Sequence, residues 1–223
     1  RYAATELASG VFMSRGDGTF RFERLPRLAQ IAPIFGMVAG DFDGDGLLDL
    51  YAVQNSHAPM PIVGRFDGGL SVWLRGDGRG GFAVAPFAES GLVVPGDAKA
   101  LAACDLDDDG WGDFVVTRNS GATLVFQNRG VAGRRALRVA LRGGRGNPHA
   151  IGARITVELF DGRTQALEVQ AGAGYYSQSS AAGFFGYEEK RGPRAVRINW
   201  PSGKETQHEV TAGAARLTLT ERE

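Results

Sequence analysis

The chain has 223 residues, enough for one large or two small domains, and it carries equal numbers of basic and acidic residues, 25 of each. The charge is uneven: residues 1–130 hold 11 basic and 16 acidic residues, and residues 131–223 hold 14 and 9. Because the basic excess is spread over strand-like segments, the sequence disfavours nucleic acid as a partner. The single cysteine excludes an internal disulfide, and we expect no membrane span.

The first motif in chain order is an apolar segment followed by Arg-Gly-Asp-Gly and a phenylalanine. It occurs at residues 11–22 and 72–84, and residues 124–130 resemble the start of a third copy. Each copy is predicted to be a hairpin. The Arg-Gly-Asp triplets raise the possibility of cell adhesion, but each falls in a turn, where Gly and Asp satisfy the backbone geometry. The sequence therefore disfavours an adhesion role.

Two acidic stretches alternate with these hairpins: DFDGDGLLDL begins at residue 41 and DLDDDGWGDF at residue 105. Carboxylates stand at positions 1, 3, 5 and 9 of both, with glycine at position 6. Carboxylates crowded in this way repel one another, and calcium, which takes six to eight oxygen ligands, removes the repulsion. The matched spacing predicts two calcium sites, whose carboxylate ligands are Asp41, Asp43, Asp45 and Asp49, and then Asp105, Asp107, Asp109 and Asp113.

These loops are not EF-hands, which require a glutamate at position 12 and flanking helices. Position 12 is Ala52 in the first loop and Val116 in the second. The flanking segments are apolar and show no helical period, so each loop is predicted to connect two strands of a hairpin. The four segments concerned are 36–40, 48–54, 100–104 and 112–118.

The spacing of these motifs predicts the organisation of residues 1–130. The repeated Arg-Gly-Asp turns are 60 residues apart and the acidic loops 64 apart. A period of that size with several short strands per unit is typical of β-propeller blades. We expect an all-β protein with about two blades, and the alternative that these belong to a larger propeller stays open.

A polar, glycine-rich linker around residues 130–135 marks the boundary between the repeats, residues 1–130, and a second part, residues 131–223. The second part alternates short apolar segments with turn signals, which predicts a small β-sandwich or barrel of six or seven strands. Asp161-Gly162 suits a type I′ hairpin turn. Trp200, ahead of Pro-Ser-Gly, is predicted to be a core anchor.

The acidic loops DFDGDGLLDLYAVQN and DLDDDGWGDFVVTRN, alternating with the GDG…F turns, resemble the FG-GAP/VCBS repeats of integrin-type β-propellers and secreted bacterial proteins. In that family the four carboxylates and the backbone carbonyl of position 7 hold calcium. The resemblance thus implies two further ligands, the carbonyl oxygens of Leu47 and Trp111.

The second part resembles the ASPIC/UnbV domain of the cartilage acidic protein 1 family. The resemblance rests on NPHAIGARITV (147–157), AGAGYYSQSS (171–180), FFG (184–186) and NWPSG (199–203). It implies a calcium-binding, non-enzymatic protein that is secreted, periplasmic or on the cell surface.

No catalytic constellation is evident in the sequence. His57, His149 and His208 are scattered, and YYSQSS lacks a nucleophile elbow. We therefore expect a non-catalytic binding or assembly module, whose partner is a protein or a cell-surface glycan. Two alternatives stay open: a carbohydrate-binding accessory module that stacks sugars on Tyr175, Tyr176 and Trp111, and a subunit of a secreted enzyme complex. Residues 171–180 are either a polar, aromatic binding loop or a glycine-kinked strand with its tyrosines in the core.

Overall fold

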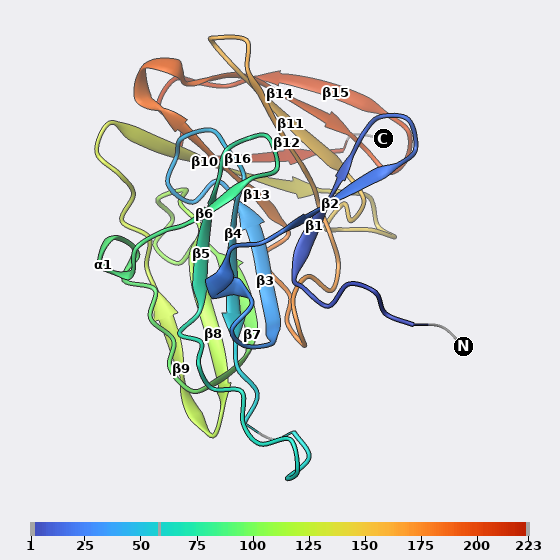
Figure 1. Cartoon of the computed structure of the whole chain (residues 1–223). Coiled ribbons are helices and arrows are strands. Elements are labelled where there is room, and N and C mark those ends of the chain that lie inside the picture. The colour runs from blue at the N-terminus through green and yellow to red at the C-terminus, as the bar shows by residue number, and fades with distance from the viewer. Residues whose placement is uncertain (1–2, 58, 222–223) are drawn as a thin grey trace.

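Short β-strands dominate the chain, joined by turns and loops (Figure 1). The computed structural model describes residues 3–57 and 59–221. Most strand pairs are antiparallel, and none of the sheets formed by these residues closes into a ring. The predicted all-β class, with blade-like sheets followed by a β-sandwich, is confirmed.

The first part of the chain consists of a hairpin and two larger antiparallel sheets. The hairpin is β1 (Gly10–Ser14) with β2 (Phe20–Arg24), followed by the short 3-10 turn Arg27–Ala29. The four-stranded sheet contains β3 (Ile34–Gly40), β4 (Asp49–Gln54), β5 (Val72–Gly76) and β6 (Phe82–Val84). After α1 (Phe87–Ser90), the three-stranded sheet contains β7 (Asp97–Cys104), β8 (Asp113–Asn119) and β9 (Gly121–Phe126).

Strand β4 is buried along its whole length because it has a hydrophobic core on each face. Alternate side chains of a strand point to opposite faces of its sheet. Leu50 and Ala52 accordingly join a core beside the β1–β2 hairpin, whereas Tyr51 and Val53 join a core shared with β7 and β8. The four-stranded sheet is therefore packed between its neighbours.

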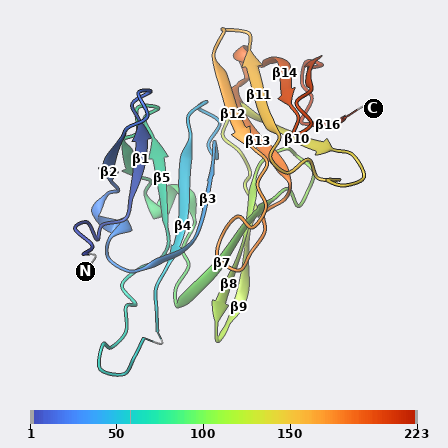
Figure 2. The ribbon, with the colours of Figure 1, turned by 90° about the vertical axis from the view of Figure 1, so that its right-hand side faces the viewer.

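The second part is a sandwich of two sheets (Figure 2). One sheet has the order β13-β10-β16 and the other β12-β11-β14-β15, and β16 runs parallel to β10. Their bounds are β10 (Arg134–Arg142), β11 (Arg154–Leu159), β12 (Thr164–Glu168), β13 (Ala182–Glu188), β14 (Pro193–Asn199), β15 (Glu205–Glu209) and β16 (Arg216–Thr220), with a 3-10 turn at Glu189–Arg191.

The core of the sandwich comes from the inward-facing residues of both sheets and includes the predicted anchor Trp200. Trp200 is 3% exposed, and its Nε1 donates a hydrogen bond of 2.9 Å to Thr206 Oγ1. The indole thus fills apolar space while its one polar group keeps a partner.

Two local expectations differ from the structure. The turn at Asp161-Gly162 is not type I′, which needs positive φ at both central residues, because only Gly162 has positive φ. Residues 124–130 do not open a complete third hairpin: β9 pairs with β8, and no described strand pairs with its other edge. From there the chain continues into the sandwich.

The helical segments of the chain are each a single turn. Within residues 3–57 and 59–221, no helix has the length and apolar character needed to cross a membrane.

We predict that Trp200→Ala lowers the free energy of unfolding of the sandwich by about 3–5 kcal/mol, because it leaves a cavity in the core. The exposed aromatic Phe160, on the neighbouring hairpin, provides the control: Phe160→Ala removes a ring that is 68% exposed. Chemical denaturation of both variants measures the difference. Equal losses of stability would contradict the assignment of Trp200 to the core.

Candidate metal centres at the junction of the two parts

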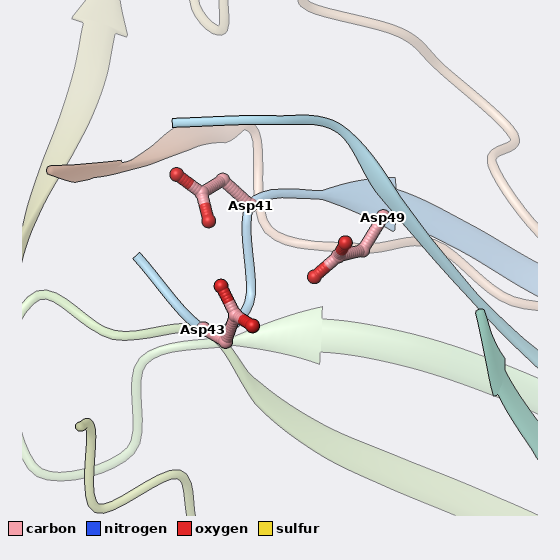
Figure 3. Close-up of side chains that lie close together, drawn as sticks. All are labelled: Asp41, Asp43 and Asp49. Atoms are coloured by element: carbon pink, nitrogen blue, oxygen red, sulfur yellow. The ribbon is translucent and has the colours of Figure 1, made fainter. Parts of the chain in front are cut away.

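The first acidic loop connects β3 to β4. The last residues paired between these two strands before the loop are Gly40 and Asp49. Carboxylate oxygens of Asp41, Asp43 and Asp49 lie within 4.8 Å of one another and face a common space (Figure 3). All three side chains are buried. The loop thus gathers, in one small volume, the hard oxygen atoms that a divalent cation binds.

Hydrogen bonds within the loop explain why this sequence turns so tightly. Asp41 accepts backbone N–H groups from Gly44 at 2.7 Å and Gly46 at 2.8 Å. Both glycines have positive φ, 78° and 87°, which residues with a Cβ rarely adopt. Asp49 accepts from Trp73 Nε1 and from the Gly76 N–H, both at 3.1 Å.

The second acidic loop connects β7 to β8 and brings together Asp105, Asp107 and Asp109. The Asp105 side chain is 1% exposed, yet neither of its oxygens has a hydrogen-bond partner among the described residues. An unpaired buried carboxylate is strongly unfavourable without a compensating cation. This orphaned group is the observation that best fits a bound metal.

One predicted ligand stands outside each cluster. Asp45 accepts the backbone N–H of Leu47 at 2.8 Å. Asp113, which is fully buried, accepts the N–H groups of Leu106 and Asn128, both at 2.7 Å. These two carboxylates therefore shape their loops, and their role as ligands stays a prediction, as do the carbonyls of Leu47 and Trp111.

Burial and mutual repulsion weaken the acidity of the loop carboxyls. Burial raises the pKa of Asp41 to about 7 and that of Asp49 to about 6, against hydrogen bonds that lower them. In the second loop, burial raises the pKa of Asp109 and of Asp113, and neighbouring aspartates add to the effect. A cation placed among these groups would reverse the effect by favouring their charged forms.

Several arginines lie next to carboxylates at the edges of the two clusters. They were not predicted from the sequence. Asp43 forms ion pairs with Arg134 of β10 at 2.7 Å and with Arg75 of β5 at 3.1 Å. Asp105 faces Arg138 of β10 more distantly, at 3.9 Å. Arg75 belongs to the second Arg-Gly-Asp triplet, and its guanidinium pairs with Asp43 and with Glu89 of the same chain.

Both acidic loops touch the sandwich. A methyl group added at Gly186 of β13 would lie 2.5 Å from an Asp41 oxygen, and one added at Gly110 would lie 2.5 Å from the Ala215 carbonyl. Phe184 of β13 is buried in the core that Phe42 and Phe114 form with the rest of the repeats. The two metal-loop candidates therefore sit where the repeats and the sandwich meet.

The segment 171–180 makes a further attachment between the two parts. Ser177 Oγ donates to the Leu101 carbonyl at 2.8 Å, and the Ala103 N–H donates to Ser179 Oγ at 3.1 Å. Of the two readings of this segment, a strand with its tyrosines in the core is wrong: the segment is a loop, and Tyr176 is 92% exposed.

The three proposed sugar-stacking aromatics do not form one platform. Trp111 is 7% exposed and packs against Gly44 and Gly130, so its face is not available to a ligand. Tyr175 and Tyr176 lie edge to face with a centroid distance of 4.6 Å on the surface.

The spacing of the β10 arginines is a feature of the sequence that could have pointed to them. Arg134, Arg138 and Arg142 recur every fourth residue, which places them on one face of a strand. Their partners could not be read from the sequence because they lie on distant loops.

Together, the fold and the acidic loops define a β-repeat protein joined to a β-sandwich, with candidate cation sites between paired strands. Residues 2–52 match the family model for the FG-GAP-like repeat, and residues 143–223 match the model for ASPIC and UnbV. No curated protein matches the chain. The chain therefore contains an FG-GAP-like repeat followed by an ASPIC/UnbV domain, as its motifs predicted. The narrower assignment to the cartilage acidic protein 1 family stays a prediction. Repeats of the FG-GAP type usually occur in extracellular proteins.

We predict that Gly186→Ala lowers the free energy of unfolding by about 1–3 kcal/mol, because its methyl group collides with the first acidic loop. Gly144→Ala is the matched control, since no atom lies within 4 Å of the methyl group it would add. Thermal melts of the two variants measure the effect. A Gly186→Ala protein as stable as the control would show that β13 does not pack on the loop.

Proposed function

We propose that this chain is an extracytoplasmic, calcium-binding and non-catalytic module that binds, or assembles with, a partner protein or cell-surface component. Calcium in the two acidic loops would fix the sandwich on the repeats and so present one rigid surface. The main support is the position of both loops at the junction, each facing an arginine of β10.

The second loop gives the strongest support for a cation. Asp105 is buried without a hydrogen-bond donor, and the Arg138 Nε is 3.9 Å away, beyond hydrogen-bonding distance. Calcium prefers oxygen ligands and would satisfy both Asp105 oxygens and the neighbouring Asp107 and Asp109. The first ion would be held by Asp41, Asp43, Asp45, Asp49 and the Leu47 carbonyl, and the second by Asp105, Asp107, Asp109, Asp113 and the Trp111 carbonyl.

A structural role for the ions is consistent with these donor sets. If all the predicted ligands bind, each ion has four carboxylates and one carbonyl, which leaves few positions for a substrate to bind the ion directly. Binding through an assembled surface is therefore favoured over metal-assisted catalysis.

Calcium should raise the melting temperature of the wild-type protein, and EDTA should reverse the change. At one hundred times its Kd, calcium stabilises the folded state by about 2.7 kcal/mol for each site. Differential scanning calorimetry with and without EDTA measures the shift. Identical melts in the two buffers would refute the calcium sites.

A matched pair of variants separates the site from general charge effects. Asp105→Asn should lose the calcium-dependent part of the shift that belongs to the second loop. It should also be at least as stable as wild type in EDTA, because it removes an unpaired buried charge. Asp67→Asn, at an exposed position outside both loops, should keep the full calcium shift.

The binding role predicts that a partner is retained from an extracytoplasmic fraction in calcium and released in EDTA. The Asp105→Asn protein should retain less of that partner than the Asp67→Asn protein does, because its junction is less rigid. Quantitative mass spectrometry of the three captures measures the difference. Retention that is indifferent to calcium and to both substitutions would contradict a calcium-dependent binding surface.

A further inference from the structure

Strand β10 presents three arginines on one face, with alanines between them. Arg134, Arg138 and Arg142 are spaced by four residues, and Ala136 and Ala140 fill the intervening positions. Arg134 pairs with the first acidic loop and Arg138 faces the second. The third arginine, Arg142, has no ion pair or side-chain hydrogen bond within the part of the chain that the structure describes.

Arg142 lines a surface hollow of about 960 Å³ between β10 and the loop that ends at Ala181. This volume is at the upper end of the range for small-molecule sites. Arg138 and His149 line the same hollow, and none of the described residues that line it is acidic. The lining is therefore basic, although the whole chain is neutral.

The donor group available in the hollow is the guanidinium of Arg142, which is exposed and has no ion pair among the described residues. The Nε of Arg138, by contrast, is buried and lies 3.9 Å from Asp105. The hydroxyl groups of Ser180 and Thr218 also line the hollow and could bond to neutral oxygens.

We propose that this hollow binds an acidic saccharide, with the sugar carboxylate on the guanidinium of Arg142. The planar guanidinium group matches a carboxylate through paired hydrogen bonds. His149 adds a ring nitrogen at the rim, while Ser180 and Thr218 meet ring hydroxyls. The hydroxyl lining and the size of the hollow favour a sugar over an acidic peptide. This inference names a ligand class for the binding role proposed above and does not depend on calcium.

The test is calorimetric titration of the full chain with a trisaccharide of galacturonate and, in parallel, with the neutral trisaccharide of galactose. Wild type should bind the acidic sugar and not the neutral one. Arg142→Gln should weaken binding tenfold or more, since it removes a charged hydrogen-bond donor. Arg65→Gln, at an exposed arginine in the repeats, is the matched control and should bind like wild type. Arg142 is exposed at the end of its strand, so an unchanged melt will show that the variant is folded.

Each titration is carried out in calcium and in EDTA. Acid-selective binding that depends on Arg142 in either buffer supports the site, whatever the calcium melts show. The proposal is overturned if neither buffer gives binding, if the neutral sugar binds equally well, or if Arg142→Gln binds like wild type. It is also overturned if a polyglutamate peptide binds through Arg142 and the galacturonate trisaccharide does not.

Discussion

Burial of acidic side chains where the repeats meet the sandwich is the constraint on which the rest of the structure depends. A buried carboxylate without a counter-charge costs several kcal/mol, so each one must acquire a cation or stay protonated. Asp43 has two arginines, whereas Asp105 has only the distant Arg138. The two loops, alike in sequence, are therefore electrostatically different, and the second has the greater need for a metal.

Close approach is what makes this electrostatic arrangement possible. Gly186 lets β13 lie directly on the first loop, and Gly110 lets the second loop reach the backbone beside β10. The shared core adds an apolar contribution, because Phe184 of β13 packs with Phe42 and Phe114 of the repeats. Ion pairs, close contacts at the two glycines and the packing of Phe184 thus hold the repeats and the sandwich together.

Whether a contact could be predicted from the sequence depends on how far apart its two residues are along the chain. The acidic loops and their strand pairs were readable because Asp41 and Asp49 belong to one short motif with a fixed spacing. The Asp43–Arg134 pair, 91 residues apart, was not, since nothing local specifies which strand lies over the loop. The type I′ turn failed because Asp161-Gly162 sits in a longer connection, in which only the glycine has positive φ. The burial of Trp111 was missed because its neighbour, Gly44, comes from the other loop.

The parallel pairing of β16 with β10 has a consequence for biosynthesis. The hairpins of the repeats form between neighbouring segments and can close while the ribosome is still translating. The sheet around β10, by contrast, waits for Thr220 to emerge, since β16 supplies one of its edges. Pairings this remote in sequence are slow to form. Until then the nascent repeats expose the apolar site that Phe184 later fills, and in that interval they are most vulnerable to aggregation and to proteases.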